Sequence, residues 1–249
     1  MTVQEVLQLN LIEKQFQESK QFFKTHQTKD IKFRKQQLKL LSKSIKDHET
    51  ELLESLKIDL GKGSVEAYAT EIGILLKSIK TARKELKNWA KTKQVDTPLF
   101  MFPSKSYIKP EPYGTILIIG PFNYPVQLLF EPLIGAIAAG NNAIIKPSEL
   151  TPHVAQVVRK VIEDVFASDF VAVVEGGVEE TQTLINLPFD YIFFTGSENV
   201  GRIVYEAASK NLVPVTLELG GKSPVIVDET ANIKVASDRI SFGKFTNAG

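Results

Sequence analysis

A carboxylate set between two large apolar residues and followed by two glycines is the feature of this chain that points most directly to chemistry. The segment reads Leu217-Glu218-Leu219-Gly220-Gly221-Lys222-Ser223-Pro224. Apolar neighbours desolvate a carboxylate and make it a better proton acceptor when it is ionised. Glycines lack a Cβ and let backbone and ligand approach closely. The pattern predicts that Glu218 is a general base, although it also suits a strand end, a Gly-Gly turn and a surface glutamate.

Polar or glycine-rich sets follow four of the predicted strands. They are residues 120–125, 146–149, 176–177 and 195–201. In open parallel sheets, ligands bind beyond the carboxyl ends of the strands. We therefore expect these sets to form one site, whereas each set alone is an ordinary turn.

Individual side chains in these sets suit a nucleotide. The segment from Gly196 to Gly201 opens a helix directly after an apolar strand, so its N–H groups can attract a phosphate, and Ser197 adds a hydroxyl donor. The spacing is G-x-x-x-x-G, so the G-x-G-x-x-G fingerprint is absent. Lys146 and Glu149 suit ribose hydroxyls as donor and acceptor. Taken alone, each of these is more often a plain helix start or a surface charge.

Two other segments have an alternative interpretation. The amide of Asn123 could donate to an oxyanion, or Asn123 could be a turn asparagine between prolines. Gly221-Lys222-Ser223 resembles the end of a phosphate-binding P-loop, which needs a glycine five positions before Gly221. That position is Thr216, so a nucleotide triphosphatase is not expected.

From Tyr113 onward, apolar strands alternate with helical patterns. Strands are predicted at 115–119, 142–146, 170–175, 191–194 and 215–219, and helices at 126–139, 152–166, 179–186 and 200–209. Thr151 is the expected N-cap of the second of these helices, with Pro152 at its first position. This alternation predicts an α/β fold with a Rossmann-like parallel sheet and flanking helices.

The first 92 residues are predicted to be helical, because apolar residues recur at three- or four-residue steps. The three stripes are Val3, Val6, Leu7 and Leu11; then Leu38, Leu41, Ile45, Leu52, Leu53 and Leu56; then Ile72, Leu75, Leu76, Ile79 and Leu86. The glycine-rich break at 61–63 separates the last two. The charges between the apolar positions are expected to lie on solvated faces.

Residues 91–112 have a different character, with four prolines among exposed-looking apolar residues. Prolines remove ladder donors, so this segment is predicted to be an edge hairpin. Its apolar residues suggest pairing with another element or another subunit.

Composition excludes several classes. The 249 residues carry 30 Lys plus Arg against 29 Asp plus Glu, so charge gives no argument for nucleic acid or an anionic membrane. The chain has no cysteine, and its three histidines are far apart, so no disulfide and no metal site are expected. No signal peptide or sufficiently long apolar run is recognised, which predicts a soluble cytoplasmic protein.

Taken in order, the motifs resemble those of one family. They are Pro121-Phe122-Asn123-Tyr124-Pro125, Lys146-Pro147-Ser148-Glu149, Phe194-Thr195-Gly196-Ser197 and residues 218–224. This chain resembles the aldehyde dehydrogenase superfamily over essentially its whole length, and is most similar to the class 3 branch. The resemblance implies oxidation of an aldehyde to a carboxylic acid with NAD or NADP, and a homodimeric enzyme. Glu149 would repel a 2′-phosphate, which favours NAD.

The resemblance also implies roles for individual residues. A cysteine thiolate attacks the aldehyde, Asn123 stabilises the oxyanion, and Glu218 activates the water that hydrolyses the resulting thioester. Lys146 and Glu149 would hold the adenosine ribose, Gly196 and Ser197 the pyrophosphate, and Val200 the adenine, with the Leu219 backbone near the nicotinamide. The other cofactor-binding residues expected from the resemblance are Ile119, Pro121, Gly201 and Gly220.

This sequence departs from the family pattern in two ways. It holds no cysteine and ends at a segment that precedes the nucleophile in the family, and Phe122 replaces a common tryptophan. We therefore expect a dinucleotide-binding domain (residues 1–90 and 113–217), an oligomerisation hairpin (91–112) and the start of a catalytic domain (218–249), with a first strand at 223–228. The 249 residues alone are expected to bind cofactor without oxidising aldehydes.

Two other functions remain open. The chain could be a non-catalytic dinucleotide-binding or subunit-interaction module. It could also come from a related reductase that transfers acyl groups to coenzyme A or phosphate, although water activation by Glu218 favours hydrolysis.

Overall fold

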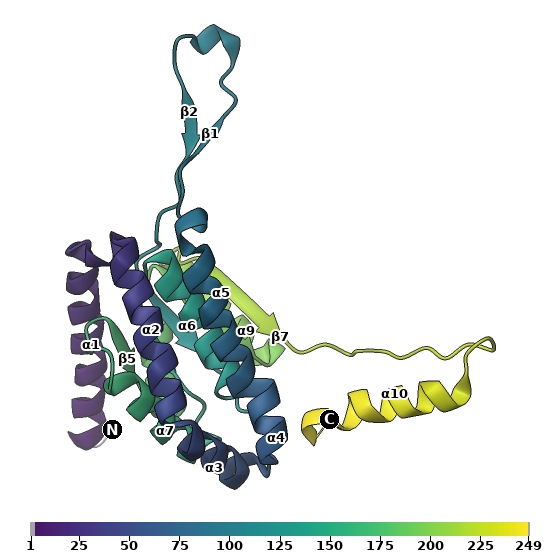
Figure 1. The fold of residues 1–249 in the computed structure, drawn as a ribbon. Coiled ribbons are helices and arrows are strands. Elements are labelled where there is room, and N and C mark those ends of the chain that lie inside the picture. Colours follow the sequence, from purple (N-terminus) through teal and green to yellow (C-terminus); the bar gives the residue numbers. More distant parts are fainter. Residues whose placement is uncertain (1–2, 249) are drawn as a thin grey trace.

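Five parallel strands form the centre of the protein, which a computed structural model describes over residues 3–248 (Figure 1). The strands are β3 (Thr115–Ile119), β4 (Asn142–Lys146), β5 (Val171–Val173), β6 (Tyr191–Gly196) and β7 (Val215–Leu219). Their order is β5-β4-β3-β6-β7. The chain runs outward from β3 to β5 and then returns to the other side of β3. The strand order therefore reverses between β3 and β6, and the predicted α/β Rossmann-like sheet is confirmed.

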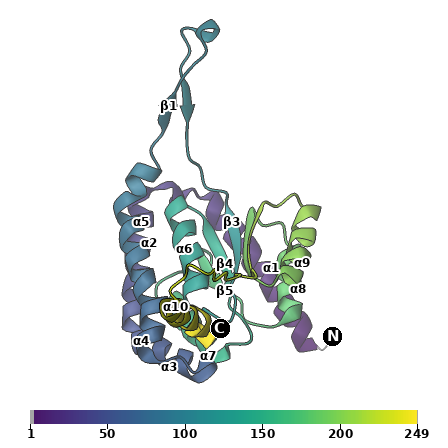
Figure 2. The same ribbon diagram turned by 90° about the vertical axis from the view of Figure 1, so that its right-hand side faces the viewer.

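Helices cover both faces of this sheet (Figures 1 and 2). One face carries α2 (Ile31–Asp47), α5 (Gly73–Trp89), α6 (Gln127–Ala139) and α7 (Pro152–Glu163), with α3 (Glu49–Leu60) against α7. The other carries α1 (Val3–Lys24), α8 (Val178–Asn186) and α9 (Glu198–Lys210). Each face of the sheet packs against its helices in a separate hydrophobic core. Because side chains alternate along a strand, Ile116 and Ile118 enter the core with α2, α5, α6 and α7, while Leu117 and Ile119 enter the core with α1, α8 and α9.

The second and third apolar stripes of the helical segment form part of the core on the α2, α5, α6 and α7 side of the sheet. The second and third stripes are buried or half-buried, as predicted. The first stripe is wrong at Leu11, which is 64% exposed, whereas Ile12 and Phe16 are buried. Phe16 packs edge-on against Phe189, with ring centroids 4.8 Å apart, and this contact turns the adjacent stripe of α1 inward. The side chains of Val3, Val6 and Leu7 lie outside the described residues.

The N-terminus of α7 is capped differently from the prediction. The helix begins at Pro152, directly after Thr151, as expected. The Thr151 hydroxyl, however, donates to the Ser148 carbonyl at 3.4 Å and caps no helix amide. Asp59 of α3 replaces it, because its Oδ2 accepts a hydrogen bond from the Val154 amide at 2.8 Å. The α7 N-terminus is therefore capped by a residue of another helix, which the sequence around Thr151 could not predict.

The region between residues 60 and 73 and three short turns complete the helical part. α4 (Ser64–Ala67) continues into a π-helix, η2 (Tyr68–Ile72), which leads into α5. Short 3₁₀ turns are η1 (Gln27–Lys29), η3 (Leu99–Met101) and η4 (Thr246–Ala248). Among the described residues, no helix is long and apolar enough to span a membrane.

A hairpin protrudes from the body of the protein (Figures 1 and 2). β1 (Lys93–Val95) and β2 (Ser106–Ile108) pair antiparallel and form a separate two-stranded sheet. Near its tip, Leu99, Phe100 and Phe102 are 88%, 87% and 80% exposed. The predicted hairpin and its exposed apolar residues are thus confirmed.

After β7 the chain leaves the body in an extended segment and returns through α10 (Ile233–Phe245) (Figure 1). The strand predicted at 223–228 is wrong, since these residues have no strand conformation. A strand needs a paired neighbour, and among the described residues none runs beside this segment. Its contact with α10 is a hydrogen bond from the Lys244 ammonium to the Ser223 carbonyl, at 3.1 Å.

Candidate active site

The carboxyl ends of β3, β4, β6 and β7 border one cavity of about 1090 Å³. It lies where the strand order reverses, which is the usual ligand position in open α/β sheets. The cavity is lined by all but one of the site residues expected from the sequence: Ile119, Pro121, Asn123, Lys146, Glu149, Gly196, Ser197, Val200, Glu218, Leu219 and Gly220. The exception, Gly201, lies behind the wall, where a Cβ would be 2.8 Å from the Leu219 side chain.

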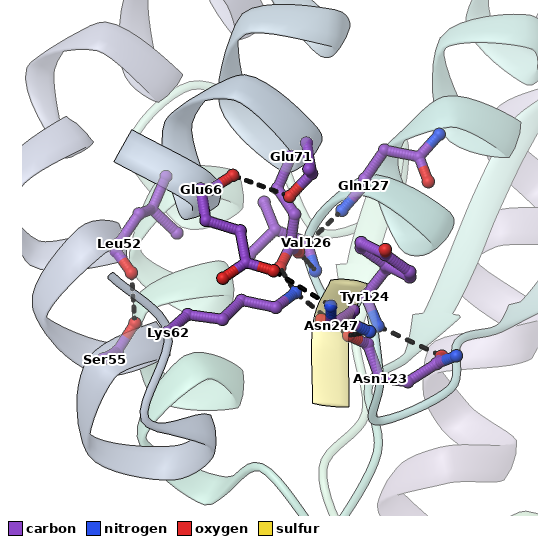
Figure 3. Close-up of polar contacts among 11 residues, drawn as sticks. Leu52, Ser55, Lys62, Glu66, Glu71, Asn123, Tyr124, Val126, Gln127 and Asn247 are labelled. Atoms are coloured by element: carbon purple, nitrogen blue, oxygen red, sulfur yellow. Dashed lines mark hydrogen bonds and ion pairs between the residues drawn. The ribbon is translucent and has the colours of Figure 1, made fainter. Parts of the chain in front are cut away.

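Asn123 lies in the loop between β3 and α6. Its Oδ1 accepts a hydrogen bond from the Tyr124 amide at 3.1 Å, so the amide oxygen is occupied (Figure 3). Asn123 borders the cavity, and its Nδ2 group has no protein partner among the described residues. The Asn123 carbonyl accepts from Lys62 Nζ and Asn247 Nδ2, each at 3.0 Å. The backbone is therefore held while the NH₂ group stays available to a ligand.

Glu218 is near the end of β7, in register with Thr195 of β6. It borders the same cavity as Asn123, but its side chain is exposed. The expectation that Leu217 and Leu219 desolvate this carboxylate is therefore wrong in this structure. β7 is the edge strand of the sheet, so its outer side has no neighbouring strand among the described residues.

Lys146 is the last residue of β4 and is only 1% exposed. Its ammonium donates to the Pro147 carbonyl at 2.9 Å and to Glu149 Oε2 at 3.3 Å. Burial lowers the pKa of Lys146, and the Glu149 charge opposes this shift. A cation thus lies at the floor of the cavity with a half-exposed carboxylate at its rim, an arrangement that can donate to and accept from adjacent hydroxyls.

The N-terminus of α9 opens onto the cavity. Ser197 is its N-cap, and its Oγ accepts from the Val200 amide at 3.4 Å, which leaves the hydroxyl proton for a ligand. Thr195 Oγ1 is buried with no partner in the described part of the chain. A Cβ on Gly196 would lie 2.6 Å from the Phe194 ring, so this ring packs directly on the Gly196 backbone. Such a set of donors suits an anionic group.

The predicted Gly176–Gly177 set contributes less directly. Neither glycine lines the cavity, although Val178, Thr181 and Gln182 of the following helix do. Gly176 has φ 141°, and Glu180 occupies the space where a Cβ would lie. Its role is thus in the turn that starts α8.

Sequence reasoning missed polar residues of α6 and of the helical segment. Gln127 and Glu131 both line the cavity, and Glu131 Oε2 is buried without a partner among the described residues. Burial raises the pKa of Glu131. Their i, i+4 spacing in an apolar helix beside Asn123 is a signal that could have revealed a shared face.

The expectation of solvated charges is wrong for Lys62 and Glu71, which are 5% and 0% exposed. They form an ion pair in the interior, next to the Asn123 loop (Figure 3). The position of Lys62 between two glycines in a helix break is the only local hint that it differs from the other lysines.

Fold and site together define an α/β protein with a cavity at the switch point of its sheet, bordered by an amide, a carboxylate and a lysine. The sequence profile described as the aldehyde dehydrogenase family matches residues 4–249. The chain belongs to the aldehyde dehydrogenase family.

Similar proteins cover nearly all of this chain. It is 75% identical to the 4,4′-diaponeurosporen-aldehyde dehydrogenase of Staphylococcus aureus over 97% of the chain and 52% of the relative. It is 42% identical to aldehyde dehydrogenase family 3 member A2 of Macaca fascicularis over 96% of the chain and 49% of the relative. The chain thus spans about half the length of the curated relatives it matches.

Solved structures give the same picture. A substrate-bound Staphylococcus aureus AldH superposes with a TM-score of 0.94 at 75% identity, over 96% of this chain and 52% of the other. A Mycobacterium tuberculosis aldehyde dehydrogenase complexed with NAD⁺ has a TM-score of 0.77 at 27% identity, over 87% and 44% of the two chains.

Proposed function

We propose that this chain provides the cofactor site, the oxyanion amide and the general base of an NAD(P)-dependent aldehyde dehydrogenase. The observation that carries the proposal is that Asn123 and Glu218 border one cavity together with Lys146 and Ser197. Family membership and the likeness to an NAD⁺-bound relative support it.

The residues around the cavity fit a nicotinamide dinucleotide. Lys146 and Glu149 hold the adenosine ribose, while the N-terminus of α9 with Ser197 holds the pyrophosphate. The Thr195 hydroxyl, which has no partner among the described residues, supports this fit. The remaining contacts are proposed for Ile119, Pro121, Val200, Gly201, Leu219 and Gly220. When bound, the cofactor supplies the hydride acceptor.

The chemistry of the chain's own residues follows from their positions. Asn123 Nδ2 donates to the carbonyl oxygen of the aldehyde as negative charge develops there. Glu218 takes a proton from the water that attacks the acyl carbon, and the sulfur of the nucleophile leaves. The 249 residues contain no cysteine, so this nucleophile lies outside them. We propose that the 249 residues alone bind cofactor without oxidising aldehydes.

The domain division follows the same proposal. Residues 1–90 and 113–217 form the dinucleotide-binding domain, and residues 218–249 begin the catalytic domain. The hairpin at 91–112 joins two copies of the enzyme as a homodimer. Its exposed Leu99, Phe100 and Phe102 support this, because large apolar side chains at a protruding tip favour a partner surface.

That same exposure favours a second candidate, a subunit-interaction module with no catalytic role. The two functions differ in what they require of the cavity. An enzyme half must bind the dinucleotide through Lys146, whereas an interaction module must associate through the hairpin even when the cavity is blocked.

Titration of NADH fluorescence tests the proposal in the 249-residue chain. Saturable binding is expected, and Lys146→Met should weaken it about tenfold, since a charge-assisted hydrogen bond contributes about 1.5–3 kcal/mol. Lys43→Met is the matched control, because it removes the same charge from an exposed lysine paired with Asp47. Absence of binding, or an equal effect of both variants, would overturn the cofactor site. NADH formation from NAD⁺ and an aldehyde would overturn the proposed inactivity.

A further inference from the structure

A buried ion pair lies beside the Asn123 loop, although its members come from the helical segment. Lys62 lies in the break between α3 and α4, and Glu71 lies in the π-helix η2. Their side chains are 4% and 0% exposed. A buried charge is costly unless it is paired and its remaining hydrogen-bonding capacity is used. The other hydrogen-bond partners of Lys62 and Glu71 therefore show which part of the chain this ion pair fixes in place.

Glu71 uses its second oxygen on the start of α6. Its Oε2 accepts hydrogen bonds from the Val126 amide at 2.9 Å and the Gln127 amide at 3.3 Å. The first amides of a helix have no partner inside the helix, and a carboxylate there also interacts favourably with the helix dipole. The N-cap residue of α6, Val126, supplies no side-chain cap. Glu71 thus anchors the far end of the Asn123 loop.

Lys62 holds the near end of that loop. Its ammonium donates to the Asn123 carbonyl at 3.0 Å and lies 4.2 Å from the centre of the Tyr124 ring. The Asn247 side-chain Nδ2 is a second donor to the same carbonyl, at 3.0 Å. The backbone amide of Asn247 donates to Glu66 Oε1 at 3.1 Å (Figure 3). One ion pair therefore contacts both ends of residues 123–127.

We propose that Lys62 and Glu71 are positioning residues, which hold the loop so that the Asn123 NH₂ group points into the cavity. The inference rests on the proposed oxyanion role of Asn123. It goes further because it assigns a task in the site to two charges of the helical segment that do not themselves line the cavity. A pair that only stabilised the fold would need no contact with this loop, yet both members contact it.

The side-chain amide signal of Asn123 in a ¹⁵N NMR spectrum tests the proposal, and Asn123→Asp assigns it. Asn123 is exposed, but its Oδ1 accepts a hydrogen bond from the Tyr124 amide at 3.1 Å. In the wild-type chain we therefore expect one NH₂ pair that is shifted from the position of asparagines without such a bond. In Lys62→Met this pair should move to the position of asparagines without such a bond. In Glu71→Gln the Val126 and Gln127 amides should exchange about tenfold faster with solvent, because they lose a charged acceptor. Lys62→Arg should restore much of the wild-type signal.

Further variants separate positioning from folding. Lys62→Met/Glu71→Gln leaves no unpaired buried charge and should fold, yet it should still lose the Asn123 signal. Asn247→Ala, which removes the second donor, should shift the signal less and in the same direction. Lys20→Met is the control, because it removes a partly buried lysine–carboxylate pair with Asp190 near the start of β3, far from the loop.

An unchanged Asn123 signal in both the folded double variant and Asn247→Ala would overturn the positioning role. The NMR measurement needs no cofactor. Failure of the wild-type chain to bind NADH would therefore count against the proposed function alone and leave the inference to be decided by the signal.

Discussion

Substitution of three glycines by alanine tests the packing at the start of the central strand β3. Gly114 precedes β3 with φ 142°, and a Cβ there would lie 2.1 Å from Asp190 Oδ2. That oxygen accepts a hydrogen bond from the Thr115 amide at 2.7 Å, and Asp190 also pairs with Lys20 at 2.7 Å. Gly114→Ala must therefore displace a carboxylate that ties β3, β6 and α1 together.

The other two glycines are matched controls that separate strain from collision. Gly61 ends α3 with φ 69°, and Gly135 lies in α6; a Cβ at either would meet nothing within 4 Å. We expect Gly61→Ala to cost about 1 kcal/mol of unfolding free energy through left-handed strain alone. Gly135→Ala should gain about 0.5–1 kcal/mol, because alanine favours a helix interior.

Gly114→Ala combines both costs. Backbone strain contributes about 1–3 kcal/mol, and the loss of one charge-assisted hydrogen bond contributes about 1.5–3 kcal/mol, so the sum is about 4 kcal/mol. Urea unfolding followed by circular dichroism measures the differences. The expected order of stability is Gly135→Ala, wild type, Gly61→Ala, Gly114→Ala. The reasoning is refuted if Gly114→Ala is no less stable than Gly61→Ala.

Three further predictions concern charged groups. Glu149→Gln should improve NADP⁺ binding relative to NAD⁺ about fivefold by calorimetry, because removing a carboxylate near a 2′-phosphate relieves about 1 kcal/mol of repulsion; an unchanged ratio would contradict it. The hydrogen bond to Asp164, with help from Glu51, raises the pKa of His48, so its stabilisation is complete below about pH 6.5 and is lost as pH rises through the folded value. His48→Asn should therefore flatten the fall in unfolding free energy above pH 6.5, as measured by urea unfolding, by at most about 1 kcal/mol because the Asp164 side chain of the pair is 60% exposed. Burial raises the pKa of Glu131, so stability falls as pH rises from about 4.3 through the folded value, and Glu131→Gln should be the more stable protein at neutral pH but not near pH 4.

The strand core of this protein was predictable because its signal is local. β3 is a short, almost continuous apolar run, and β3 and β4 are fully buried along their length. Two apolar stripes in the helical segment were likewise found from their spacing. The first stripe failed at Leu11, because which side of α1 faces inward depends on a contact between Phe16 and Phe189, far apart in the sequence.

The site was predictable only where its residues follow strands. Asn123, Lys146, Ser197 and Glu218 all lie at carboxyl ends of strands, so the topology brings them to one edge. Lys62 and Glu71 follow no strand and resemble the many solvated charges of their helices. Their burial arises from tertiary contacts with the Asn123 loop, which local sequence does not encode.

The exposure of Glu218 links its proposed role to the surroundings of β7. A carboxylate becomes a stronger base when it is desolvated, and Glu218 lies on an edge strand that is open to solvent on its outer side. α10 stands apart from the sheet, and its Phe242 and Phe245 are 77% and 79% exposed (Figure 1). Large apolar side chains and an open strand edge both favour further packing. A polypeptide that packs along β7 would desolvate Glu218, and we expect such a cover to strengthen Glu218 in its proposed role as a general base.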